Sequence, residues 1–109
     1  MEKREGYAVL LVTAPADGAG ETIARALVER RLAACVNRVP GIRSVYRWEG
    51  TIESGGEDLL IVKTAAPLLD RLEETIRELH PYEVPEMLVL PIDGGSAPYL
   101  DWIAASLEE

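Results

Sequence analysis

The expected β-strands of this chain are apolar on both faces, and this feature limits the folds available to it more than any other. A sheet that helices cover on one side normally alternates apolar and polar residues along each strand. Residues 7–12 instead present Tyr, Val and Leu on one face and Ala, Leu and Val on the other. Residues 59–62 and 87–90 repeat the pattern with Leu, Ile, Val and Met. Whichever face meets the helices, the other face also needs protection from water.

The second apolar face is large enough to decide the state of the molecule. Burying one Val, Leu or Ile contributes about 1.5–3 kcal/mol, so roughly five of them represent an upper bound of roughly 7–15 kcal/mol. This range matches the net stability of a whole domain, about 5–15 kcal/mol. A last helix folded under the sheet would cover part of this face, whereas neighbouring copies would cover more of it. The pattern therefore favours a closed oligomer, a homotrimer in which three sheets meet.

Turn residues and short apolar runs predict four main strands. The expected strands are residues 7–14, residues 35–48 with a bend at Pro40-Gly41, residues 58–64 and residues 84–92. A hairpin turn is expected at residues 53–57, because paired glycines tolerate positive φ, and another turn is expected at residues 93–95.

Apolar residues at helical spacing predict three helices. The first is expected over residues 21–32, and the second opens at Pro67 and ends at His80-Pro81. Ser96 is expected to cap the last helix. One face of that helix is expected to carry Tyr99, Trp102, Ile103 and Leu107. The resulting order, β-α-β-β-α-β plus a C-terminal helix, is the ferredoxin-like α+β arrangement, with both main helices on one face of an antiparallel sheet.

Length and charge exclude several classes of protein. A chain of 109 residues fits a single domain, expected over residues 1–109 with a core at about 7–107. The net charge of −8 argues against binding to nucleic-acid backbones and to anionic membranes. One cysteine allows no intrachain disulfide, and the apolar run near the N-terminus is too short for a signal core or a membrane span. We therefore expect a cytoplasmic protein.

Five short segments, taken together, carry a resemblance to a known family. They are Ala34-Cys35-Val36-Asn37, Tyr46-Arg47-Trp48-Glu49-Gly50, Lys63-Thr64, Leu79-His80-Pro81-Tyr82-Glu83-Val84-Pro85-Glu86 and Tyr99-Leu100-Asp101-Trp102. In this order and spacing the chain closely resembles the CutA divalent-cation-tolerance family, over about residues 7–107. The resemblance implies a ferredoxin-like fold, a tight homotrimer and a role in the response to divalent metal ions, especially copper. It also implies similarity to the PII signalling trimers, which bind small ligands in clefts between subunits.

His80 is the candidate metal ligand, because it is the only histidine and imidazole suits Cu, Ni or Zn. The alternative is a helix-ending histidine that hydrogen-bonds a carbonyl group. The resemblance implies two further copper ligands in some members, but Val12-Thr13 and Leu79 occupy those places here. A three-fold site with one His80 from each subunit is the remaining arrangement for Cu²⁺ or another divalent cation. No other cofactor is expected.

A second candidate site is a cleft that binds an anionic small molecule. Its expected residues are Arg47, Lys63, Tyr82 and Glu86, with Arg38 and Arg43 as further positive residues. The alternative reading of these cations is interface ion pairs with acids such as Glu49. Trp48, Tyr46 and Glu49 are expected to anchor the interface between subunits.

Cys35 is expected to be a small buried apolar residue rather than a reactive thiol. A hydrolase would need Cys35 and His80 to meet as nucleophile and base, and nothing in their spacing predicts this. We therefore expect a protein that is not an enzyme. The predicted function is that of a trimeric divalent-cation-tolerance protein that binds metal weakly. The alternative is a PII-like sensor of an anion or nucleotide, or a protein scaffold without a metal function.

Overall fold

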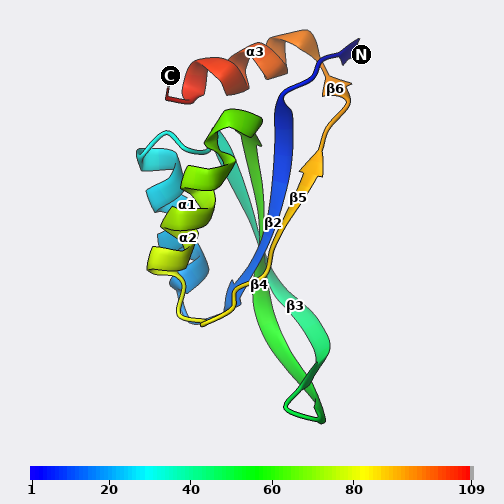
Figure 1. Cartoon of the computed structure of the whole chain (residues 1–109), viewed down its shortest axis with the longest axis vertical. Coiled ribbons are helices and arrows are strands. Elements are labelled where there is room, and N and C mark those ends of the chain that lie inside the picture. The colour runs from blue at the N-terminus through cyan, green and yellow to red at the C-terminus, as the bar shows by residue number, and fades with distance from the viewer. Residues whose placement is uncertain (109) are drawn as a thin grey trace.

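The computed structural model describes residues 1–108, and four of its strands form one antiparallel sheet beside two helices (Figure 1). The elements in chain order are β1 (Glu2–Lys3), β2 (Tyr7–Pro15), α1 (Ala19–Glu29), β3 (Cys35–Trp48), β4 (Thr51–Ala65), a 3-10 turn (Ala66–Leu68), α2 (Leu69–Leu79), β5 (Met87–Pro91), β6 (Gly94–Gly95) and α3 (Ala97–Ser106). The main sheet has the order β3-β4-β2-β5, and β1 pairs with β6 in a small second sheet. The expected ferredoxin-like α+β fold is confirmed.

The core lies between one face of the sheet and the helices. Leu10 and Val12 of β2 and Leu60 and Val62 of β4 are at most 4% exposed, because alternate residues of each strand point to this side. The helices meet them with residues at helical spacing, namely Ile23 and Leu27 of α1 and Leu72 and Ile76 of α2. The helix α3 closes one end of this core with Leu100 and Ile103.

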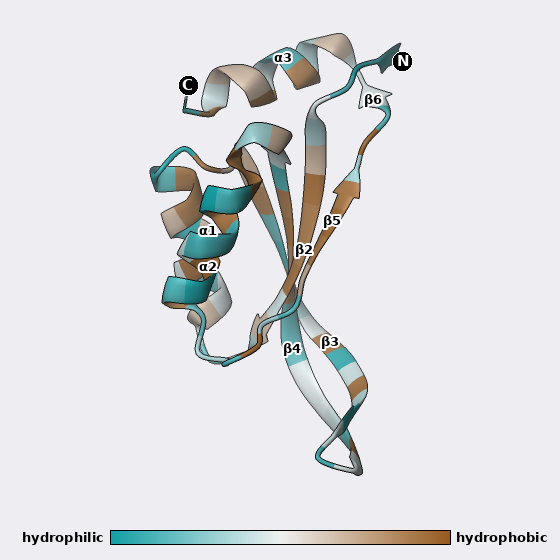
Figure 2. Ribbon diagram, in the orientation of Figure 1, coloured by the Kyte–Doolittle hydropathy of each residue, from teal (hydrophilic) through white to brown (hydrophobic). Residues whose placement is uncertain are grey.

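The opposite face of the sheet is apolar and lacks cover in the protomer. Leu88 and Leu90 of β5 are 56% and 49% exposed. Their β2 partners Leu11 and Val9 point to the same side, and apolar colour runs along both strands (Figure 2). The β4 residues opposite Leu11 and Thr13 are Ile61 and Leu59, which extend this surface. We call this surface, which consists of Val9, Leu11, Leu59, Ile61, Leu88 and Leu90, the open sheet face.

The β3–β4 hairpin extends well beyond the helices, at the end of the sheet opposite α3 (Figure 1). We call its part beyond Pro40, residues 41–56, the arm. Trp48 pairs with Thr51, so the turn has two residues, Glu49 and Gly50, and both have positive φ (49° and 81°). Such a turn matches the twist of the strands. The expected turn at residues 53–57 is therefore wrong, because Gly55 and Gly56 lie inside β4, opposite Ser44 and Arg43.

The C-terminal part differs from the sequence expectation in three ways. The last helix turns Leu100, Ile103 and Leu107 inward, whereas Tyr99 and Trp102 are exposed and stack on one another at 5.5 Å. The fourth strand begins only at Met87, because residues 84–86 belong to the loop after α2. Residues 94–95, expected as part of a turn, pair with β1. The cap is confirmed, because Ser96 accepts a hydrogen bond from the Tyr99 amide.

The first helix also has different limits. It begins at Ala19 and ends at Glu29, whereas the sequence predicted residues 21–32. Arg31 has a φ of 59°, a left-handed conformation that ends the helix. Leu32, the last residue of the predicted range, is buried just after this turn.

Candidate functional site

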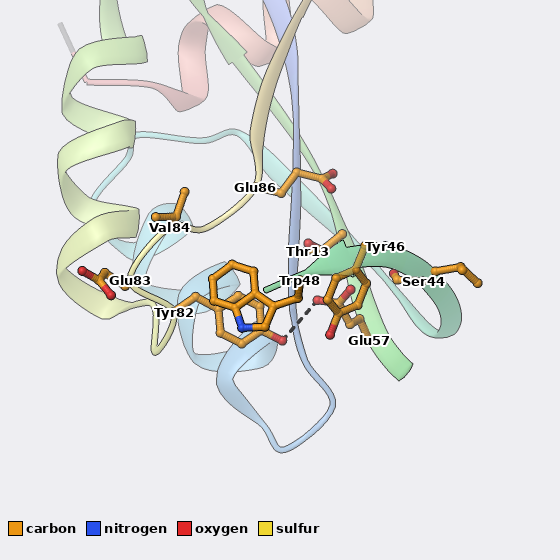
Figure 3. Close-up of a pocket in the computed structure, with 10 residues that line it drawn as sticks. Thr13, Ser44, Tyr46, Trp48, Glu57, Tyr82, Glu83, Val84 and Glu86 are labelled. Atoms are coloured by element: carbon orange, nitrogen blue, oxygen red, sulfur yellow. Dashed lines mark hydrogen bonds between the residues drawn. The ribbon is translucent and has the colours of Figure 1, made fainter. Parts of the chain in front are cut away.

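A pocket of about 580 Å³ lies between the base of the arm and the loop that follows α2 (Figure 3). Its lining residues come from four separate segments: Thr13, Ser44, Val45, Tyr46, Trp48, Glu57, Tyr82, Glu83, Val84 and Glu86. Its volume is within the range typical of small-molecule sites, about 300–1,000 Å³.

The arm supplies one wall because of the period of two along a strand. Ser44, Tyr46 and Trp48 alternate along β3 and therefore share one face. Glu57 of β4 stands opposite Ile42, at the base of the arm, and so belongs to the same face. Tyr46 and Trp48 are 49% and 57% exposed, which leaves much of each ring surface open.

The loop wall is held by His80, which is 7% exposed. Its Nε2 atom lies 2.7 Å from the Thr13 carbonyl oxygen, and its Nδ1 atom accepts a hydrogen bond from the Tyr82 amide at 3.0 Å. A carbonyl oxygen can only accept, so Nε2 is the donor in this contact, while Nδ1 is the acceptor. Both ring nitrogens are thus used to fasten the loop to the end of β2.

Tyr82 links the two walls of the pocket. Its hydroxyl group donates a hydrogen bond to Glu57 Oε2 at 3.2 Å, and its ring lies 4.7 Å from that of His80. Burial and the nearby Glu57 carboxylate raise the pKa of Tyr82 above its ordinary value, since both disfavour a phenolate. The hydroxyl group therefore remains a donor at neutral pH.

The charge of the pocket is negative. Glu57, Glu83 and Glu86 contribute carboxylates, and none of the described residues that line the pocket is basic. The cavity can therefore attract a cation, and its aromatic rings can contact one.

The structure brings together only part of the predicted cleft. Tyr82 and Glu86 line the pocket, together with the predicted interface anchors Tyr46 and Trp48. Arg47 lies between these two anchors on β3 and so points to the opposite face. Lys63 lies six residues along β4 from Glu57, about 20 Å away within the protomer. Glu49 is in the turn of the arm.

Sequence reasoning missed Glu57, Thr13 and Ser44 as site residues. The signal that could have found Glu57 is strand register: a turn at Glu49-Gly50 places residue 57 opposite residue 42, on the face of Tyr46. The Thr13 contact with His80 joins residues 67 positions apart, and no local pattern indicates it.

The remaining candidate groups lie apart from one another. Cys35 is half-buried and stands opposite Lys63, which in turn pairs with Val9 of β2. His80 contacts Thr13, four residues and therefore about 13 Å further along β2. The protomer thus does not join Cys35 and His80 as a nucleophile and its base. Within residues 1–108, no group of three or more His, Cys, Asp or Glu side chains is arranged to hold a metal ion.

Comparison with known proteins gives a consistent result. A family profile described as "CutA1 divalent ion tolerance protein" matches residues 8–106. The divalent-cation tolerance protein CutA of Thermus thermophilus is 52% identical over 95 residues, which cover 87% of this chain and 92% of the relative. The chloroplastic protein CutA of Arabidopsis thaliana is 51% identical over 98 residues, and this chain spans about half of its length (90% of this chain, 54% of the relative).

A solved structure supports the same relationship. The crystal structure of CutA1 from Oryza sativa superposes with a TM-score of 0.93 at 47% sequence identity, covering 96% of each chain. None of these relatives carries the name of an enzyme. No helix within residues 1–108 has both the length and the apolar character needed to cross a membrane.

Proposed function

Because this chain belongs to the CutA1 divalent-ion-tolerance family, we propose that it acts in tolerance of divalent cations as a non-catalytic, self-associated protein of the cytoplasm. The single cysteine and the acidic composition suit a reducing, aqueous compartment. The proposal has three parts: assembly through the open sheet face, weak binding of a divalent cation, and no chemical step.

The open sheet face is the observation that carries this proposal. Leu88 and Leu90 are about half exposed on its edge strand β5, and Val9, Leu11, Leu59 and Ile61 continue the surface across β2 and β4. The arm adds Trp48, which is more than half exposed and shares the face of Glu57, two residues along β4 from Leu59. A continuous apolar surface of this kind is typical of an interface between protomers. Three copies with their sheets facing inward would close it, giving the homotrimer.

Cation binding follows from the family and from the acidic surface beside His80. Both imidazole nitrogens have backbone partners, so a metal ion must displace one of them, and binding is expected to be weak. One protomer offers no complete ligand set within residues 1–108. A site for Cu²⁺ or a similar ion would therefore combine His80 groups from different copies.

The size of the pocket favours a second candidate function, that of a small-molecule sensor. If its ligand is an anion or a nucleotide, Arg47 and Lys63 must be supplied to the cleft by neighbouring copies. A sensor of this kind would keep the trimer and would have no metal function.

Assembly is tested by the mass of the native protein at micromolar concentration, measured by light scattering. The expected value is three times the chain mass of 11.9 kDa. Leu88→Glu places a charge on the open sheet face and is expected to reduce the mass to that of one chain. Val28→Glu is the matched control, because Val28 is 43% exposed on α1, and this variant should remain a trimer. A native mass of one chain would contradict the proposal.

Metal binding is tested by isothermal titration of the assembled protein with Cu²⁺. We expect weak binding that His80→Gln lowers about tenfold or more, since the imidazole is lost while a side-chain donor remains for the Thr13 carbonyl. Circular dichroism and light scattering show whether this variant keeps the fold and the mass. Identical isotherms for the parent and His80→Gln would remove His80 as a ligand. A native protein that binds neither Cu²⁺ nor Zn²⁺ would overturn the metal function.

A further inference from the structure

We propose that a hinge joins the arm to the body of the protomer, and that a neighbouring copy sets the angle at which the arm stands. The inference deepens the proposed function, because its second part rests on the proposed assembly. It is carried by two pairs of residues at the base of the arm, Pro40-Gly41 on β3 and Gly55-Gly56 on β4.

The strand β3 loses its regular pairing at the base of the arm. Its register against β4 shifts between Val39 and Ile42. Across this shift, Pro40 and Gly41 stand where β4 has only Asp58. Such a bulge interrupts the ladder of hydrogen bonds and increases the local twist. Proline has no N–H to donate, and Gly41 has a φ of 76°, so this part of β3 contributes little to holding the ribbon straight.

The strand β4 has two consecutive glycines beside this bulge. Gly55 and Gly56 stand opposite Ser44 and Arg43, and neither has a left-handed φ that would require glycine. A Cβ atom at Gly55 would have no atom within 4 Å, and one at Gly56 would meet Arg43 at an ordinary 3.5 Å. Neither conformation nor space therefore demands a glycine here. The feature that the pair does supply is backbone freedom, since glycine has the widest range of φ and ψ.

On the body side of these two pairs, the ribbon is held firmly. The Asp58 side chain is 5% exposed, pairs with Arg38 at 3.1 Å and packs against Gly20 of α1. The neighbouring Glu57 accepts a hydrogen bond from the Tyr82 hydroxyl group at 3.2 Å. The ribbon thus changes from a held segment to a permissive one within one or two residues, which is the arrangement of a hinge.

On the other side of the hinge, the arm is exposed in the protomer. Every residue from 45 to 54 is exposed, and the arm extends beyond the helices (Figure 1). Trp48 shares the face of Glu57 and so continues the open sheet face, through which copies associate in the proposed assembly. The contacts that fix the arm are therefore those of a neighbouring copy. Residues 41–48 span about 25 Å, so a rotation of about 10° at the hinge moves the tip by roughly 4 Å.

The test is the distribution of distances between two spin labels, measured by pulsed electron paramagnetic resonance. Thr51→Cys places one label at the tip of the arm, and Glu74→Cys places the other on the exposed side of α2, after Cys35→Ser removes the native thiol. Labelled chains are refolded with an excess of unlabelled chains, so that most assemblies contain one labelled copy. We expect a narrow distribution in the native assembly and one at least about twice as wide in Leu88→Glu, which lacks neighbours.

Variants assign the width of the distribution to the hinge. Gly55→Val combined with Gly56→Ala adds side chains where the structure has room and removes backbone freedom. In the Leu88→Glu background, this double change is expected to narrow the distribution to about that of the native assembly. Ser54→Val is the matched control, because it adds a β-branched residue where a side chain already restricts the backbone, and it should leave the distribution wide. Circular dichroism confirms that each variant keeps the fold.

Two results would overturn the hinge: a narrow distribution in Leu88→Glu as a single chain, and equal widths with and without the glycine changes. A wide distribution in the native assembly would overturn the role of the neighbouring copy. Light scattering separates these results from failure of the proposed function. If Leu88→Glu keeps the native mass, the proposed interface is wrong, and the native protein then decides the hinge: a wide distribution that the glycine changes narrow supports it, and a narrow one contradicts it.

Discussion

Asp58 is the most deeply buried carboxylate among the described residues, and a single close guanidinium compensates its charge. Its side chain is 5% exposed, and Arg38 Nη1 lies 3.1 Å from Oδ2. The first turn of α1 packs directly against it, because Gly20 has no side chain there. A Cβ atom at Gly20 would lie 3.3 Å from Asp58 Oδ2. This contact joins β3, β4 and the start of α1.

Removing the guanidinium should therefore cost more than removing one from the surface. Arg38→Met leaves a buried carboxylate without its partner, and we expect the free energy of unfolding to fall by about 1–3 kcal/mol. Arg77→Met is the control, since its pair with Glu73 is more than half exposed on both sides and should contribute less than about 0.5 kcal/mol. Urea denaturation measures both. Equal losses would show that the Asp58 pair behaves as a surface pair.

For single residues, the residue type predicted the chemistry of a side chain better than it predicted the contacts of that side chain. His80 was identified as the one imidazole, and a carbonyl hydrogen bond was one of its two interpretations. The identity of that carbonyl, on Thr13, depends on how the end of α2 meets β2. Ser96 was predicted as a helix cap because capping is local, and this is confirmed. The role of Glu57 was missed, because it depends on strand register.

Among the elements, hydrophobic pattern and turn residues predicted existence and order but not every boundary. The glycine pair at residues 55–56 resembled a turn more strongly than Glu49-Gly50, although the latter makes the hairpin. Likewise, the apolar run from Val84 to Ile92 suggested one long strand. Two prolines and the bonds of His80 hold its first part as a loop instead.

The small β1–β6 sheet is an element that local pattern did not reveal. Gly94 pairs with Lys3, and a Cβ atom there would collide with the Glu2 carbonyl group. This pairing also carries the hydrogen bond from the Arg4 amide to the Asp93 carbonyl, at 2.8 Å.

Gly94→Ala is therefore expected to separate β1 from β6 and to lower the free energy of unfolding by about 1–3 kcal/mol. Gly95→Ala is the neighbouring control, because a Cβ atom there meets Leu100 at an ordinary 3.5 Å. Hydrogen exchange at the Arg4 amide should become faster in the first variant and stay unchanged in the second. Slow exchange in Gly94→Ala would mean that the two strands tolerate the side chain.

For the whole molecule, the two-sided apolar pattern was the most informative part of the sequence. It predicted a sheet with an uncovered apolar face, and the structure has one, with Leu88 and Leu90 about half exposed. The pocket could not be predicted in the same way. It combines residues from β2, the arm, the base of β4 and the loop after α2, and only the folded chain brings these segments together. Its negative character also differs from the anion cleft expected from Arg47 and Lys63.

The length of the arm has a consequence for how ligand occupancy of the pocket depends on the concentration of the protein. Tyr46 and Trp48 stand on a two-stranded ribbon that the body of the protomer does not support from behind (Figure 1). Neighbouring protomers that pack against this ribbon would hold the two rings in position before a ligand binds. Ligand binding and association of the protomers are then coupled. If association raises the affinity for a ligand that contacts both the ribbon and the Tyr82 loop, that ligand strengthens association by the same factor. The fraction of pockets with ligand bound would therefore rise with protein concentration and fall on dilution, even at a constant ligand concentration.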